Sequence, residues 1–130
     1  MKHLFVPYEL AVKLKEKGFD EPCLYTVHKE DAGDVYNGHE MEWVNWNKYG
    51  TTNVSVSAPL YQQVTNFFRE KYFIHITIKM TCSVNEVIDI KGNINFMIDE
   101  FRSPDVEVEE TDFSYYGTLS KTIEEALKYI

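Results

Sequence analysis

The chain has 130 residues, of which 44% are hydrophobic, 15% aromatic and 26% charged. This length suits one domain, and we expect residues 1–130 to fold as a single domain that buries about two thirds of the unfolded chain's surface. Thirteen basic and twenty-one acidic residues give a net charge of −8. Direct binding to nucleic acid or to an anionic membrane depends on clustered lysine and arginine, so both are disfavoured. A protein partner with a basic surface remains compatible with this charge.

The amino-terminal sequence, residues 1–7, lacks the apolar core of a secretory signal peptide. No apolar run approaches the roughly 18 residues that a membrane-spanning helix needs. We therefore expect a cytoplasmic protein that does not bind membranes. The two cysteines, Cys23 and Cys82, are too few for a disulfide framework or a cysteine-rich zinc site.

The first part of the chain predicts a helix followed by two strands. Residues 7–17 carry apolar side chains at helical spacing, and Gly18 is placed to end the helix. Residues 23–28 and 40–46 are rich in β-favouring side chains. Residues 31–38 between them are rich in turn-forming residues, so we expect a hairpin with a long connection.

A second helix and a strand are predicted next. Apolar residues from Leu60 to Phe68 recur at helical spacing, with Ser57 as the expected N-cap. Apolar and polar residues then alternate without a break over residues 74–83, as in a strand with one buried face. This pattern places Cys82 on the core side, where a buried small hydrophobic role is favoured over a reactive thiol.

Apolar residues at even positions continue from Ile88 to Ile98. The stretch Lys91-Gly92-Asn93 is either the loop of a hairpin or part of a continuous strand with a bulge at Gly92, and the alternation fits both. Val106 and Val108 alternate with acidic residues and predict a strand at or near a sheet edge.

The chain closes with a predicted helix over residues 119–130, for which Thr118 and Ser120 are candidate caps and residues 122–125 a candidate capping box. The elements alternate without a regular βαβ repeat. They predict an α+β fold with a mostly antiparallel sheet of four to five strands and about three helices packed on one face.

No motif predicts catalysis. The four histidines are scattered without metal-ligand spacing, and the sequence holds no nucleophile elbow, phosphate-binding loop or dinucleotide-binding motif. We assign no catalytic, cofactor-binding or metal-ligating residue. The protein is expected not to be an enzyme and to need no cofactor.

The acidic segment, residues 99–112, is the first candidate for partner binding. It contains one base, Arg102, and seven acids: Asp99, Glu100, Asp105, Glu107, Glu109, Glu110 and Asp112. Such a strip imitates the charge of a phosphate backbone and attracts a groove lined by lysine and arginine. The competing interpretation is a solvated edge that resists aggregation.

The second candidate is an aromatic segment, residues 43–49, in which Trp43, Trp46 and Tyr49 are spaced along a stretch rich in asparagine. Aromatic side chains bury much area at little entropic cost and therefore anchor protein interfaces. The competing interpretation is that at least one tryptophan closes the core.

Residues 1–23, 57–72 and 115–130 resemble a family of small proteins carried by phages, prophages and other mobile elements of Bacteroidota. The resemblance covers under half of the chain and excludes both candidate segments. It implies no catalytic residue or cofactor, only a genomic context in which small acidic proteins include anti-CRISPR and other anti-defence inhibitors.

That context leads to two hypotheses. In the first, the protein binds a host nucleic-acid-handling effector, with a CRISPR nuclease the leading candidate, through the acidic segment and aromatic anchors from residues 43–49. In the second, it is an accessory or self-associating structural protein of a mobile element and has no host target.

Overall fold

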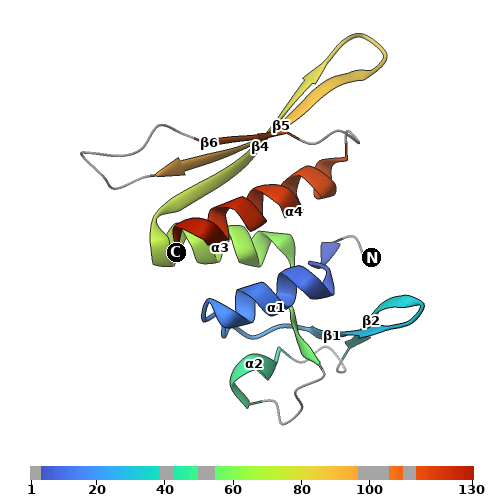
Figure 1. Ribbon diagram of the computed structural model, residues 1–130, viewed down its shortest axis with the longest axis vertical. Coiled ribbons are helices and arrows are strands. Elements are labelled where there is room, and N and C mark those ends of the chain that lie inside the picture. The colour runs from blue at the N-terminus through green and yellow to red at the C-terminus, as the bar shows by residue number, and fades with distance from the viewer. Residues whose placement is uncertain (1–3, 39–42, 50–54, 97–105, 110–113) are drawn as a thin grey trace. The chain divides into compact units, whose positions relative to one another are not determined.

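The computed structural model describes residues 4–38, 43–49, 55–96, 106–109 and 114–130. In these ranges the fold is α+β, as predicted, with four α-helices and two three-stranded antiparallel sheets (Figure 1). The expected single sheet of four to five strands therefore differs from the described structure, in which the strands divide between two sheets. The chain separates into two compact units, residues 1–64 and 65–130. Whether they constitute the single expected domain stays a prediction.

The first unit holds a sheet with the strand order β2-β1-β3. Its elements are α1 (Tyr8–Glu16), β1 (Tyr25–Glu30), β2 (Gly33–Gly38), α2 (Trp46–Tyr49) and β3 (Val56–Ala58). The predicted first helix is confirmed. It follows Pro7 directly, and the chain leaves it through Gly18, whose φ of 90° favours glycine.

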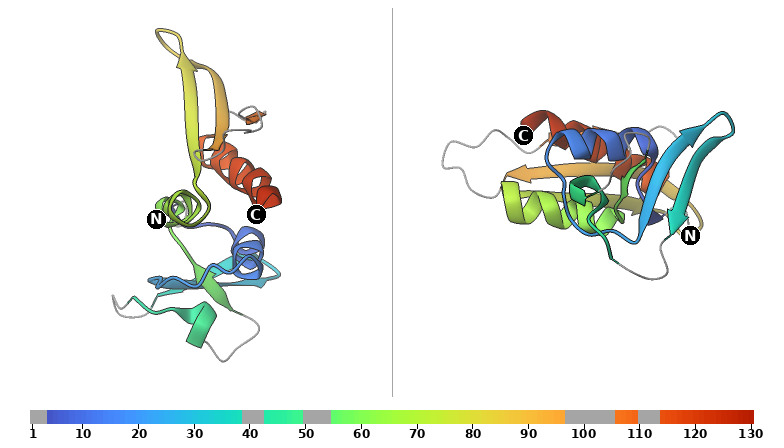
Figure 2. Two further views of the ribbon diagram at one scale, coloured as in Figure 1. Left: turned by 90° about the vertical axis from the view of Figure 1, so that its left-hand side faces the viewer. Right: turned by 90° about the horizontal axis from the view of Figure 1, so that it is seen from below.

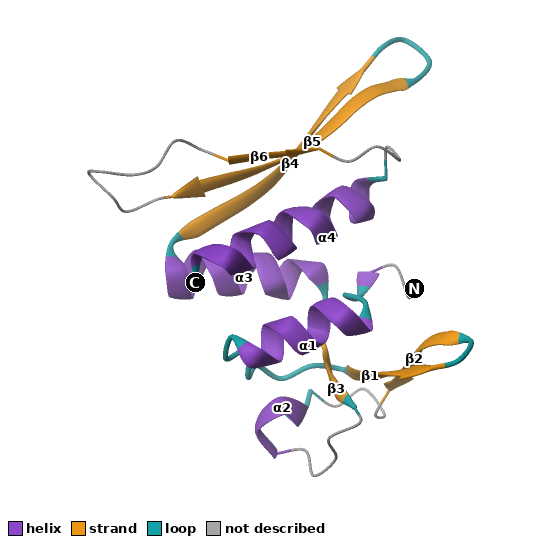
Figure 3. Cartoon of the chain, in the orientation of Figure 1, coloured by secondary structure: helices purple, strands orange, loops and turns teal. Residues whose placement is uncertain are grey.

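The hairpin of this unit corrects the sequence prediction. β1 and β2 are joined by a tight turn at Asp31 and Ala32, so the stretch expected to be a long connection is itself β2 (Figure 3). The predicted strand over residues 40–46 is wrong in the part that the structure describes, residues 43–46. Val44 makes only an isolated bridge with Cys23, and α2 begins at Trp46. The glycine and asparagine of β2 suggested a turn, but the strand lies at a sheet edge, where such residues are tolerated.

The core of the first unit lies between α1 and its sheet. Leu10, Ala11 and Leu14 share one face of α1 and are fully buried. α1 packs against β1 and β3, from which Val27 and Ala58 contribute fully buried side chains. The apolar stripe of α1 thus holds this sheet together.

α3 (Tyr61–Tyr72) confirms the second predicted helix. Its apolar residues Val64, Phe67 and Phe68 are buried, as the periodicity indicated. The expected N-cap is wrong, because Ser57 lies inside β3 and is fully buried. Gln63 instead accepts a hydrogen bond from the Leu60 amide at the start of the helix, at 3.0 Å.

The second unit contains the sheet β4-β5-β6, all antiparallel, and the helix that covers it. Its elements are β4 (Ile74–Cys82), β5 (Val87–Phe96), β6 (Val106–Glu109), α4 (Tyr115–Ala126) and the 3-10 helix η2 (Leu127–Tyr129). β4 and β6 confirm two predicted strands. α4 starts earlier than expected, with Ser114 as its N-cap, so Thr118 lies buried within the helix and caps nothing.

β5 decides between the two alternatives for residues 91–93: the hairpin loop is wrong, the continuous strand is confirmed, and the bulge expected at Gly92 is absent from the β4–β5 ladder. β5 runs continuously through Gly92, which pairs with Ile78 in regular register, and the irregularity in this ladder falls at Thr81 and Cys82. Gly92 is needed because a Cβ there would overlap the side chain of Thr122 on α4. The glycine therefore marks the close approach of helix and strand.

α4 covers only part of the β4–β5 hairpin. It packs against all three strands and buries Ile74, Ile76, Ile90 and Ile94. The hairpin extends past the end of α4, as Figure 2 shows, and Met80 is 44% exposed although the alternation predicted a buried residue. The side chain of Cys82, predicted on the core side, lies outside the description.

Candidate partner-binding surfaces

The acidic segment is described only where it forms β6. Glu107 and Glu109 lie in this strand, whereas five predicted site residues lie outside the described ranges: Asp99, Glu100, Asp105, Glu110 and Asp112. β6 is the edge strand of its sheet, as predicted for this alternating segment. The side chain of Glu107 is exposed, and nothing is described of the Glu109 side chain.

Strand register fixes the direction of Glu107. Paired residues of neighbouring strands share a face, and Val108 pairs with Gly92, which abuts Thr122 of α4. Val106 and Val108 therefore face α4 and are half-buried. Glu107 alternates with them, so its side chain lies on the opposite face of the sheet, away from α4 and beside its partner Asn93.

The face opposite α4 also carries two polar groups with unmet hydrogen-bonding capacity. His75 and Asn95 pair across β4 and β5, at odd positions like Glu107 and Asn93. In the described part of the chain, His75 Nδ1 and Asn95 Oδ1 are buried and have no hydrogen-bond partner. An unpaired buried polar group costs about 1–3 kcal/mol, so this pair weakens the sheet locally.

The aromatic segment presents one exposed tryptophan. Trp43 is 53% exposed, whereas Trp46, the first residue of α2, is half-buried. Tyr49 ends α2, and its side chain lies outside the description. The two tryptophans thus differ in exposure, and Trp43 is the one available to a partner.

The backbone beside Trp43 is held firmly. Val44 and Cys23 exchange two backbone hydrogen bonds, of 2.9 and 3.1 Å. The Asn47 side chain donates to the Phe19 carbonyl at 2.8 Å and accepts from the Ser57 amide at 3.0 Å. This anchoring limits the entropy that Trp43 loses on binding.

Sequence reasoning missed the anchoring role of the asparagines. Asn45 Nδ2 donates to the Asp20 carbonyl, and Asn45 Oδ1 accepts from the Lys48 amide at 3.2 Å. Both asparagines therefore join α2 to segments more than twenty residues away in sequence. The only signal in the sequence was that asparagine recurs between aromatic residues. Hydrophobic periodicity does not predict hydrogen bonds from such residues.

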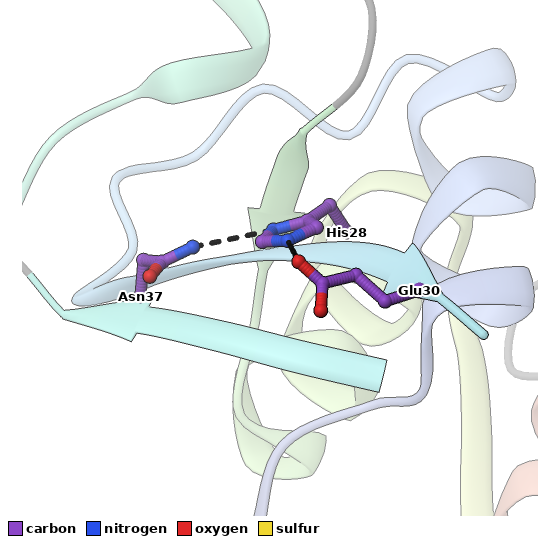
Figure 4. Close-up of polar contacts among 3 residues, drawn as sticks. All are labelled: His28, Glu30 and Asn37. Atoms are coloured by element: carbon purple, nitrogen blue, oxygen red, sulfur yellow. Dashed lines mark hydrogen bonds and ion pairs between the residues drawn. The ribbon is translucent and has the colours of Figure 1, made fainter. Parts of the chain in front are cut away.

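The β1–β2 hairpin carries a polar cluster that sequence reasoning also missed (Figure 4). His28 Nε2 lies 3.0 Å from Glu30 Oε1, and the Asn37 amide nitrogen lies 3.2 Å from His28 Nδ1. Since a carboxylate only accepts, Nε2 carries the hydrogen and Nδ1 accepts from Asn37. Both ring nitrogens are engaged, so His28 serves to brace the hairpin and is poorly placed to ligate a metal or abstract a proton.

The described residues offer little for catalysis. Desolvation raises the pKa of the buried Cys23 thiol to about 12, so the thiol stays protonated and is a poor nucleophile at neutral pH. Among the residues that the structure describes, no group of three histidine, cysteine or acidic side chains could hold a metal ion. None of the described helices combines the length and apolarity needed to cross a membrane.

No model of a known protein family, no curated protein and no solved structure matches the chain. The resemblance to mobile-element proteins therefore stays a prediction. The two surfaces, around Glu107 of β6 and around Trp43, are supported by their geometry alone.

Proposed function

We propose that this protein is a small acidic inhibitor that binds a host protein which handles nucleic acid. It occupies the basic surface of that protein in the bacterial cytoplasm and thereby excludes the nucleic acid. It acts as a binding protein without a catalytic step. The observation that carries the proposal is the exposed carboxylate of Glu107 on an edge strand, within a segment of seven acids and one base.

Electrostatics support this choice of partner. Glu107 lies on a face that α4 leaves uncovered, and the nearest base of β5, Lys91, has its Nζ 3.7 Å from Asp89 Oδ2. Lys91 is thus already engaged by an acid of its own strand, and the second lysine of this face, the exposed Lys79, lies beyond it on β4 as its strand partner. A basic groove gains favourable interactions with such a surface and associates faster because of long-range attraction.

Trp43 supports a protein partner. An exposed tryptophan on a firmly held backbone is the side chain most often found at the energetic centre of an interface. It belongs to the first unit and Glu107 to the second, so each surface is proposed and tested separately.

A CRISPR nuclease is the leading candidate partner. The resemblance of residues 1–23, 57–72 and 115–130 to proteins of phages and other mobile elements implies a setting in which host defence is the obstacle. A CRISPR nuclease also binds its guide and target in a strongly basic channel. A CRISPR nuclease therefore offers both a basic channel for an acidic ligand and a role in host defence.

The proposal is tested by inhibition of DNA cleavage with a purified CRISPR nuclease of the host. An acidic-segment triple variant, Glu107→Lys with Glu109→Lys and Glu110→Lys, is expected to inhibit at least about tenfold less strongly than the unaltered protein, because attraction becomes repulsion. Trp43→Ala is expected to weaken inhibition by a similar factor of about ten or more.

A control triple variant changes the net charge equally at exposed acids elsewhere: Glu16→Lys, Glu70→Lys and Glu86→Lys. It is expected to retain most of the inhibition. Equal losses in the two triple variants would show that only total charge matters. Undiminished inhibition by the acidic-segment variant would remove the proposal.

One observation favours the second hypothesis, self-association of an accessory protein. At the free end of the β4–β5 hairpin, Val84 is 97% exposed and Met80 44% exposed. Exposed apolar side chains at a projecting tip suit contact with another copy. Sedimentation velocity over a range of concentrations tests this: association that Val84→Asp abolishes supports it, and a monomer throughout rejects it.

A further inference from the structure

We infer that the partner binds by strand addition, in which an extended segment bearing lysine or arginine pairs with the free edge of β6 and enlarges the sheet β4-β5-β6. This inference rests on the proposed function, because it takes the basic partner as given and specifies how that partner docks.

The first step is the backbone of β6. Residues 106–109 pair with residues 91–94 of β5 along one edge only. Within the described ranges no strand pairs with the other edge. Alternate residues of an edge strand direct their N–H and C=O groups outward, where they form a template for another chain. A peptide that adds there gains a regular series of hydrogen bonds.

The second step is the pattern of side chains that the added strand would meet. On the face opposite α4 it would lie beside Glu107, and on the face towards α4 beside Val106 and Val108, which are half-buried. A segment in which basic and apolar residues alternate therefore matches both faces at once. Neither a nucleic-acid strand nor a folded basic loop satisfies the backbone of β6 in this way.

The third step excludes the most available competitor, a second copy of this chain paired through the same strand. Two β6 edges placed side by side would bring Glu107 and its acidic neighbours from both copies together. Like charges directly opposite one another destabilise a strand pair. The acids thus protect the edge from self-pairing while leaving it open to a basic strand.

The inference is tested with a short synthetic peptide in which lysine and valine alternate and both ends are capped. Nuclear magnetic resonance follows the backbone amides of the full-length protein. The outward amides of residues 106–109 are expected to exchange at least about tenfold more slowly with peptide, because two or more hydrogen bonds of about 1 kcal/mol each form there. Glu107→Lys should abolish this protection, and Glu16→Lys should not.

The matched control is the same peptide with every backbone amide N-methylated, which keeps charge and side chains but removes the N–H donors. Strand addition predicts binding at least about tenfold weaker for this peptide. Equal binding of the two peptides would overturn strand addition and leave the acidic surface of the proposed function intact. Protection located on β2 or β4, or present without peptide at high protein concentration, would likewise overturn it.

Failure of the inference is distinguishable from failure of the proposed function. If neither peptide binds but the acidic-segment triple variant still loses inhibition of the nuclease, strand addition is rejected and the inhibitor proposal stands. If inhibition survives the triple variant, the proposed function is rejected whatever the peptide does.

Discussion

Phe73, between α3 and β4, shows how a single residue is held against its own preference. It has a positive φ of 57°, a conformation that is costly for a bulky side chain, and it is 46% exposed. Glycine is the usual residue where a chain leaves a helix in this conformation. An exposed phenylalanine at this position is therefore less favourable for stability than glycine would be.

This strain predicts an inverted order of stability for two substitutions. Phe73→Ala and Phe73→Gly both remove the ring, but only glycine relieves the positive φ, so Phe73→Gly should have the larger free energy of unfolding by about 1 kcal/mol. At Arg69, exposed within α3, alanine should instead exceed glycine by about 1 kcal/mol. Urea denaturation measures both pairs. The same order at both positions would contradict strain at Phe73.

At the scale of helices and strands, the most specific prediction concerns the contact between β5 and α4 at Gly92. Gly92→Ala places a Cβ against the Thr122 side chain, so the free energy of unfolding should fall by about 1–3 kcal/mol. In the Thr122→Ala background, Gly92→Ala should cost less, because two of the three contacted atoms are absent. A thermodynamic cycle of the four proteins gives the coupling, and a value near zero would contradict the close approach.

Sequence patterns predicted the elements whose faces differ in polarity and missed those fixed by single contacts. The alternation from Ile74 to Ile78 fits only a strand with one buried face, and the helical spacing in α3 fits only a helix. The even-numbered apolar positions around Gly92 fit a loop, a bulge or a continuous strand, and only Thr122 decides. β2 was missed because its composition is that of a turn. Of the candidate site, the edge position of β6 was predictable, but the exposure of Trp43 depends on distant partners of Asn45 and Asn47.

At the scale of the whole molecule, stability should decline in alkaline solution. Desolvation raises the pKa of Cys23 from 9.0 to about 12 and that of Tyr36 from 10.0 to about 12. The unfolded chain therefore releases these protons at lower pH than the folded protein, so the stability that they contribute is complete below about pH 9 and is lost as pH rises towards 12. Chemical denaturation at several pH values measures this decline. It should be shallower in Cys23→Ala and in Tyr36→Phe, and an unchanged slope in both would contradict the assignment.

The central claim, that a local acidic edge binds a basic nucleic-acid-handling protein, concerns the molecule's charge as a whole. A net charge of −8 alone would attract any basic protein weakly and without a defined site. The alternative is a surface centred on β6, where Glu107 is exposed and the backbone edge is unpaired within the described residues. The two triple variants separate these cases, because they carry the same net charge and differ in where it was changed.

The most direct measurement is therefore the inhibition of the purified CRISPR nuclease by these two variants, repeated at low and moderate ionic strength. The account predicts that the control triple variant inhibits nearly as well as the unaltered protein and loses potency as salt rises. It predicts that the acidic-segment triple variant is at least about tenfold weaker at low salt and depends less on salt. Equal inhibition by the two variants, or inhibition independent of salt, would contradict it.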